Sequence, residues 1–92
     1  MNIVQTSTFS RTVKKLHKNQ KQDLDKAVRA LVENPNIGEP KVGDLSGISV
    51  YKFKMVKQLT LLAYHYEDET LTLSLLALGS HENFYRDLKK SS

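Results

Sequence analysis

The sequence predicts an α+β domain in which an N-terminal helical hairpin packs on one face of a mainly antiparallel sheet. Two observations predict this class. Apolar residues recur at helical spacing in the first third of the chain, and from residue 50 onward they alternate with polar residues at a period of two. The predicted order is β-α-α-β-β-β-α, and the 92 residues are enough for one small domain, 1–92, with a single modest core.

The chain is predicted to begin with a strand followed by a helix. Residues 2–5 form the strand. Residues 6–8 are Thr, Ser and Thr, which are favoured N-caps because their hydroxyl oxygens accept hydrogen bonds from the first free backbone N–H groups of a helix. The helix that follows carries three apolar residues at helical spacing, namely Phe9, Val13 and Leu16.

A second helix is predicted to start at Asn19, with Gln22 at the position of a capping box. Its buried face is predicted to hold Leu24, Ala27, Val28 and Leu31. The pair Asn34-Pro35 ends this helix, because the residue before a proline is disfavoured in helical conformation. Residues 36–49 contain three glycines and a proline, and are predicted to be a connecting loop.

The second half of the chain is predicted to be a three-stranded meander. Turn residues at Lys57-Gln58 and Glu67-Asp68-Glu69 separate three segments of alternating pattern. The strands begin at Val50, Leu59 and Thr70, and the last two end at Tyr66 and Leu78. A short final helix holds Phe84 and Leu88, and the sheet face away from the helical hairpin is expected to stay at least partly free.

The composition limits the classes of function. Lysine and arginine number 14 against 10 acidic residues, and the resulting net charge of +4 favours a polyanionic or acidic partner. The chain has no cysteine, its three histidines fall in separate predicted elements, and no glycine-rich phosphate loop follows a strand, so neither a metal nor another cofactor is expected. With no apolar signal core and no bilayer-spanning segment, we expect a cytoplasmic protein without membrane contact.

Two groups of residues are candidates for chemistry. Lys52 and Lys54 are two positions apart on a strand and therefore project from the same face, while Tyr51 and Phe53 project from the other. The alternative interpretation is a solvated strand face whose lysines discourage edge pairing. The segment Gly79-Ser80-His81 then places an imidazole just beyond a strand end. An imidazole in general can donate a proton near neutral pH.

The order of elements and several short motifs resemble the RelE/ParE superfamily of toxins from bacterial toxin–antitoxin modules, over nearly the whole chain. The motifs are Leu45-Ser46-Gly47, Tyr51-Lys52-Phe53-Lys54, Leu61-Leu62-Ala63-Tyr64 and Gly79-Ser80-His81. Members of the RelE branch are ribosome-dependent endonucleases that cut mRNA in the ribosomal A site, whereas members of the ParE branch poison DNA gyrase. The fold alone therefore does not decide the function.

The resemblance also implies site residues. Lys52 and Lys54 match the lysine pair of RelE-type nucleases, and His81 stands where the family carries a catalytic arginine or histidine. Tyr85 matches an aromatic residue that stacks on, or orients, the nucleotide at the cut. The expected catalytic residues are thus Lys52, Lys54, His81 and Tyr85, and the expected RNA-binding residues are Lys57, His65 and Arg86. The structural alternatives are a loop residue or helix cap at His81 and packing against Phe84 at Tyr85.

One position departs from the pattern of RelE-type nucleases. They usually carry an arginine on the strand just before a Leu-Val-Tyr-like run, and here that position is Leu61, or Thr60 if the turn shifts by one residue. His65 projects from the same strand face and either substitutes for the arginine or has a structural role. The expected partners are an acidic antitoxin that folds on binding, forming a hetero-oligomer, together with the ribosome and mRNA. The alternatives are a ParE-like gyrase inhibitor, a catalytically weak toxin scaffold and a plain interaction module.

Overall fold

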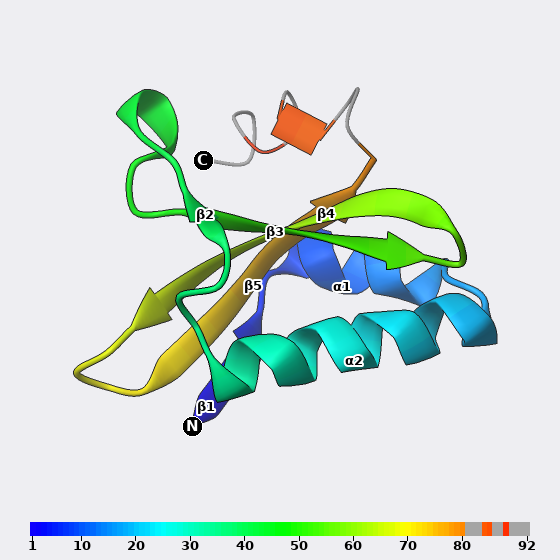
Figure 1. Ribbon diagram of the computed structural model, residues 1–92, viewed down its shortest axis with the longest axis horizontal. Helices are drawn as coiled ribbons and strands as arrows, with labels where there is room; N and C mark the ends of the chain where they lie inside the picture. Colours follow the sequence, from blue (N-terminus) through cyan, green and yellow to red (C-terminus); the bar gives the residue numbers. More distant parts are fainter. Residues whose placement is uncertain (81–83, 86–87, 89–92) are drawn as a thin grey trace.

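A computed structural model describes residues 1–80, 84–85 and 88 of the chain. Its elements are β1 (Asn2–Gln5), α1 (Ser7–Lys14), α2 (Lys18–Glu33), β2 (Glu39–Pro40), the 3-10 helix η1 (Gly43–Leu45), β3 (Ser49–Met55), β4 (Gln58–Glu67) and β5 (Thr72–Gly79). The strands form one sheet in the order β1-β5-β4-β3-β2, and both α-helices cover one of its faces (Figure 1). Among the described strands, β1 and β5 pair in parallel and the other pairs are antiparallel. The predicted α+β class and mainly antiparallel sheet are confirmed.

Thr6, one of the three predicted candidates, is the N-cap of α1. Its hydroxyl oxygen accepts a hydrogen bond from the backbone N–H of Phe9 at 3.1 Å, and the same hydroxyl donates to the carbonyl of Leu76 at 2.8 Å. The cap therefore satisfies a free N–H group of the first turn and also fixes the helix start to the neighbouring strand β5.

The predicted start of the second helix was wrong. α2 begins at Lys18, and the backbone N–H of His17 donates to the Gln20 side chain at 2.8 Å, so the side chain that reaches back to the cap is Gln20 and not Gln22. His17 has an extended backbone (φ −74°, ψ 164°), which is the conformation that the residue before a helix needs. The end of the helix at Asn34 is as predicted.

The predicted loop over residues 36–49 contains a short edge strand and a helical turn that the composition did not indicate. β2 pairs with the start of β3, and its proline is compatible with a strand because an edge strand leaves one side unpaired. Tyr64 of β4 also holds the start of this loop. Its hydroxyl donates a hydrogen bond to the Pro35 carbonyl at 2.6 Å and accepts one from the Gly38 N–H at 3.0 Å. A Cβ atom at Gly38 would overlap this hydroxyl, so only glycine fits there.

The meander forms as predicted, with two corrections at its turns. The first hairpin turns at Val56-Lys57, not at Lys57-Gln58, and both turn residues are left-handed, with φ of 50° and 68°. Two such residues in a two-residue loop match the right-handed twist of the flanking strands. Leu71 was predicted to lie within the last strand, but it belongs to the preceding turn, with φ of 50° and 51% of its surface exposed.

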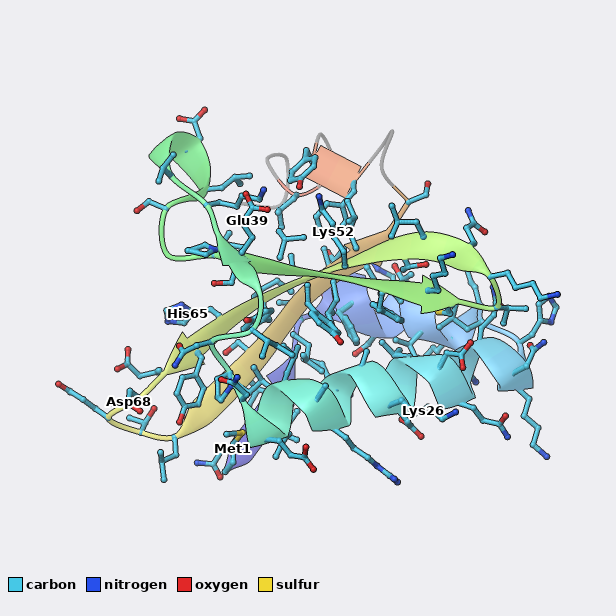
Figure 2. The ribbon with its side chains drawn as sticks, viewed as in Figure 1. Met1, Lys26, Glu39, Lys52, His65 and Asp68 are labelled. Atoms are coloured by element: carbon cyan, nitrogen blue, oxygen red, sulfur yellow. The ribbon has the colours of Figure 1, made fainter. Side chains whose placement is uncertain are left out.

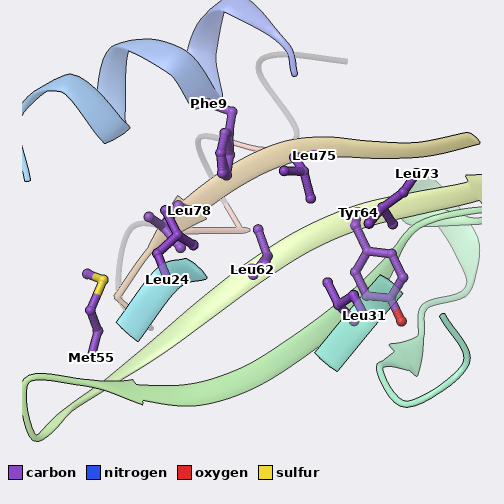
Figure 3. Packing of buried hydrophobic residues seen from close by; sticks show 9 residues of the cluster. All are labelled: Phe9, Leu24, Leu31, Met55, Leu62, Tyr64, Leu73, Leu75 and Leu78. Atoms are coloured by element: carbon purple, nitrogen blue, oxygen red, sulfur yellow. The ribbon is translucent and has the colours of Figure 1, made fainter. Parts of the chain in front are cut away.

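Two hydrophobic clusters lie on opposite sides of the sheet. The first, between sheet and helices, includes Phe9, Leu24, Leu31, Met55, Leu62, Tyr64, Leu73, Leu75 and Leu78 (Figure 3). The second includes Leu45, Val50, Leu61, Ala63, Ala77, Phe84 and Leu88. Phe84, Tyr85 and Leu88 are helical, as predicted, and they belong to or pack against the second cluster, on the sheet face opposite α1 and α2. No helix in the described part of the chain is long and apolar enough to cross a membrane.

Candidate functional site

Lys52 and Lys54 are both exposed on the sheet face opposite α1 and α2, so the prediction that they project from the same strand face is confirmed. Lys52 pairs with Leu61 of β4 and Lys54 pairs with Leu59. The alternating residues Tyr51 and Phe53 pack against the cluster on the helical side, with their rings stacked at a centroid distance of 6.0 Å. We call the surface around the two lysines the lysine face.

Tyr85 lies over the same side of the sheet. Its ring meets the Phe84 ring edge to face, at 5.2 Å between centroids and an interplanar angle of 85°, and it packs against the cluster that contains Leu61. Figure 2 shows Lys52 rising from β3 toward the side that carries these helical residues. The structure thus brings an aromatic side chain to the lysine face. The structural alternative for Tyr85, packing against Phe84, is also observed.

Lys41 is a further cation at this site, and the sequence reasoning missed it. Its Nζ lies 5.4 Å from the centroid of the Tyr85 ring and 3.4 Å from Oε1 of Glu39. Burial acts to lower the pKa of Lys41, but the Tyr85 hydroxyl and the Glu39 carboxylate outweigh it and raise the pKa, because both stabilise the charged ammonium. The available signal was that Lys41 is the only basic residue between Arg29 and Lys52.

The loop that carries Lys41 is held by one hydrogen bond within the loop and by one contact to the sheet. The backbone N–H of Lys41 donates to the Ile48 carbonyl at 2.9 Å. His65 Nδ1 lies 2.7 Å from the Gly47 carbonyl oxygen and is therefore the protonated, donating nitrogen, because a carbonyl only accepts. This contact supports the structural alternative for His65, while RNA contact by its exposed ring stays a prediction.

The position of the missing arginine is occupied by a buried residue. Leu61 is 0% exposed and lies between Lys52 on one neighbouring strand and Gly79 on the other. The other candidate, Thr60, is 4% exposed and donates its hydroxyl to the Gln58 carbonyl. Neither position therefore offers a group to a phosphate on the lysine face.

The remaining predicted residues lie near the ends of the strands or outside the described part. Lys57 is exposed in the β3–β4 turn. His81 and Arg86 fall outside the described residues. Because Gly79 pairs with Leu61, the last residue of β5 lies in the same row across the sheet as Lys52. A pocket of about 220 Å³ opens beside this strand end, between α1 and Phe84, and includes Ser80 in its lining.

Comparison with known proteins identifies the family of this chain and several solved structures that share its fold. Residues 3–89 match the family described as ParE-like toxin of type II bacterial toxin-antitoxin system. No curated protein matches the chain. A chain of the intact Escherichia coli RelBE toxin-antitoxin complex is 21% identical, with a TM-score of 0.70 over 88% of this chain and 96% of that one.

Two further structures have the same fold. A mutant of the E. coli toxin RelE in the free state is 17% identical, with a TM-score of 0.73 over 97% of this chain and 90% of that one. A chain of the RelBE2 toxin-antitoxin complex from Mycobacterium tuberculosis is 22% identical, with a TM-score of 0.67 over 87% of this chain and 96% of that one. At these identities the likeness concerns the fold, and the chemistry has to be argued from the residues.

Proposed function

We propose that this chain, which belongs to the ParE-like toxins of type II bacterial toxin–antitoxin systems, inhibits translation by cutting mRNA on the ribosome. The observation that carries the proposal is the lysine face. Lys52 and Lys54 are exposed on a sheet face whose buried residues are apolar, and Tyr85 lies over the same face. Exposed cations beside an aromatic ring suit a nucleic acid, whose phosphates they neutralise while a base stacks on the ring.

The chemistry would be metal-independent cleavage of an RNA strand. The ribose 2′-OH loses a proton to a base and its oxygen forms a bond to the adjacent phosphorus. The bond from phosphorus to the 5′-oxygen breaks, and an acid supplies a proton to that oxygen, so the products are a 2′,3′-cyclic phosphate and a 5′-hydroxyl. Negative charge accumulates on the phosphorane in the transition state, where fixed cations stabilise it more than in the ground state.

The described residues supply the electrostatic and positioning parts of this reaction. Lys52 and Lys54 stabilise the phosphorane, and the Tyr85 ring stacks on a base next to the cut. Lys41 holds the Tyr85 ring from the loop side. We assign the leaving-group acid to His81, because an imidazole that titrates near neutral pH gives up a proton readily.

The lack of an arginine at Leu61 favours dependence on the ribosome. With one fewer cation on the sheet, the protein alone would be a poor ribonuclease, and the ribosome would supply the alignment of the reacting atoms. Holding reactants in a productive geometry accounts for up to about 7–11 kcal/mol of a barrier.

The same buried leucine favours a second candidate function. A toxin that blocks DNA gyrase needs a folded scaffold and a binding surface, but no phosphorane-stabilising arginine. Leu61, fully buried at that position, is compatible with such a scaffold. In both cases we expect a cognate antitoxin partner, with an acidic segment that folds on the toxin.

Two assays run side by side separate the candidates. Primer extension on an mRNA translated by purified ribosomes reports cleavage at single-nucleotide resolution, and a supercoiling assay reports gyrase inhibition. The proposal expects cleavage products and unimpaired supercoiling. Inhibition of supercoiling with an intact message would assign the chain to the gyrase-directed toxins instead.

A further inference from the structure

The two edges of the sheet differ in how they are protected against a further strand. β2 lies at one edge with only two residues, Glu39 and Pro40, and the part of β3 that β2 leaves unpaired carries Lys52 and Lys54. Short length, charge and proline all discourage the addition of a strand. β1 lies at the other edge with four exposed residues, and none of the first ten residues of the chain has a charged side chain. We call the free side of β1 the open edge.

Apolar side chains gather at the open edge. Met1, Ile3 and Val4 are 49%, 47% and 48% exposed. Leu71, whose carbonyl accepts a hydrogen bond from the Asn2 N–H at 2.8 Å, is 51% exposed beside them. These four are half of the eight large apolar side chains that are exposed in the described part of the chain. The open edge therefore combines unpaired backbone groups with uncovered apolar surface.

The hydrogen bonds on the inner side of β1 show which of its backbone groups face the open edge. The N–H groups of Asn2 and Thr6 donate to carbonyl groups on the β5 side, at 2.8 and 3.1 Å. Because the backbone groups of successive strand residues point to opposite sides, the N–H and C=O groups of Ile3 and Gln5 point away from β5. Within the described residues no strand pairs along that side.

The spacing of these groups is complementary to itself. In an antiparallel pair of strands, two residues that lie directly opposite can exchange both of their N–H···O=C bonds. Two copies of β1 can therefore pair with Ile3 of each copy opposite Gln5 of the other, with two hydrogen bonds in each pair. Val4 then lies opposite Val4 of the second copy, on the two-fold axis, where side chains approach most closely. This register covers apolar side chains that are exposed in the single chain.

The charges at the two ends of the open edge favour the same arrangement. The acidic residues 67–69 lie at the β4–β5 turn, at the start of β1, because β1 and β5 run parallel. α1 follows the other end of β1 and carries Arg11 and Lys14, both exposed. Figure 2 shows Met1 and Asp68 on the side of the molecule away from the α1–α2 connection. Antiparallel pairing brings the acidic turn of each copy to the end where the basic helix of the other begins, whereas parallel pairing would bring the two acidic turns together.

We propose that the open edge is a site of self-association, at which a second copy of this chain pairs its β1 antiparallel to the first. This association does not require the proposed cleavage activity. A second copy fits better than an acidic antitoxin segment, because the acidic turn repels such a segment, while a second copy offers its basic α1 there.

The dimer leaves the lysine face free. Its two-fold axis is perpendicular to the sheet, so the two sheets join into one and both lysine faces lie on the same side. Lys52 and Lys54 are on β3, near the edge away from β1. The contact between two four-residue strands is small, and interfaces that bury less than about 1,200 Å² are typical of weak association. We therefore expect a dimer that dissociates on dilution.

The test measures the mass of the full-length protein by sedimentation equilibrium, from about 1 μM to 1 mM, the range of weak dissociation constants. Val4→Lys places two like charges opposite each other on the two-fold axis and should weaken the dimer about tenfold or more. The matched control Val42→Lys makes the same change at a side chain that is 87% exposed between β2 and η1, and should dimerise like the parent. Both variants should unfold at the temperature of the parent when measured as monomers.

Amide hydrogen exchange of the parent tests the strand pairing without any substitution. The Val4 N–H points toward β5 and should exchange slowly at every protein concentration. The N–H groups of Ile3 and Gln5 should exchange quickly in the monomer and slow down in proportion as the monomer fraction falls. A dimer formed through another surface would not give this alternation along β1.

Each outcome decides the inference. If the parent is a monomer up to about 1 mM, or if Val4→Lys dimerises like the parent, the open edge does not bind a second copy. If Ile3 and Gln5 are protected only when an acidic antitoxin peptide is added, the edge belongs to that partner and the inference is wrong. If the dimer forms with the expected protection but the protein cuts no message, the inference stands while the proposed cleavage fails.

Discussion

The Nζ atom of Lys41 lies 5.4 Å from the centroid of the Tyr85 ring and thereby connects the loop before β3 to the helical residues near the C-terminus. The residues are far apart in the sequence, and both lie beside the sheet face opposite α1 and α2. The contact joins a cation to an aromatic ring and thereby stabilises the position of Tyr85.

Replacing Lys41 by methionine should loosen the residues around Tyr85. The side chain keeps its apolar stem but loses the cation, and a partly exposed cation–π contact contributes about 0.5–1 kcal/mol. We expect amide hydrogen exchange at Phe84 and Tyr85 to be about two- to fivefold faster, and Lys41→Arg to exchange like the parent. The raised pKa of Lys41 means that its stabilising effect is complete below the ordinary lysine pKa and is lost as pH rises through the raised one. If hydrogen exchange at Phe84 and Tyr85 is unchanged in the methionine variant, the contact does not stabilise these residues.

Replacing both Lys52 and Lys54 by alanine should leave the fold intact and abolish growth inhibition. Both side chains are exposed, so their loss removes no packing, whereas each donor to the transition state is typically worth about 3 kcal/mol. Growth inhibition on induction and the thermal unfolding temperature measure the two effects separately. The control Lys26→Ala/Arg29→Ala removes the same charge from α2 and should stay toxic. A folded, fully toxic double variant at the lysine face would dismiss the assignment.

Introducing an arginine at Leu61 should destabilise the protein and not restore a catalytic group. Leu61 is 0% exposed and packs among apolar side chains, and the described structure places no acidic partner in that cluster. Burying an unpaired charge costs several kcal/mol, so we expect a fall of about 3 kcal/mol or more in the free energy of unfolding. Leu61→Met should cost less than about 1.5 kcal/mol. Urea unfolding measures both, and an arginine variant as stable as the parent would show that the site can admit a cation.

The left-handed turn at Val56 offers a test of strain. Val56 has φ of 50°, which is unusual for a β-branched residue, whereas asparagine adopts it readily. We expect Val56→Asn to raise the free energy of unfolding by about 1 kcal/mol. Val56→Ile keeps the branch and should leave stability unchanged. If asparagine and isoleucine give the same stability, the turn is not strained.

The sequence predicted the elements well where the pattern was long and periodic. The period-two segments around Lys52 and Leu73 gave the meander, and the helical spacing of Leu24 and Leu31 gave α2. The start of α2 was missed because asparagine is a favoured N-cap residue, and Asn19 was therefore chosen. The observed cap is His17, whose backbone N–H is bound by the Gln20 side chain, and residue type alone does not reveal this contact.

The candidate site was predicted only in part, for a physical reason. Lys52 and Lys54 share a face by strand geometry alone, which is local information. The contact between Lys41 and Tyr85 depends on how a loop folds back over the sheet, and so does the bond from His65 to Gly47. Such long-range contacts leave no periodic trace in the sequence.

The most direct measurement is the single-turnover cleavage of one defined mRNA, offered once in the A site of a programmed ribosome and once as free RNA. The account predicts a specific cut in the ribosome-bound message, products with 2′,3′-cyclic phosphate and 5′-hydroxyl ends, and loss of the cut when the nucleotide before it carries a 2′-O-methyl group. It predicts negligible cleavage of the free RNA. Equal cutting of both substrates, or no cutting of either beside inhibited gyrase, would contradict it.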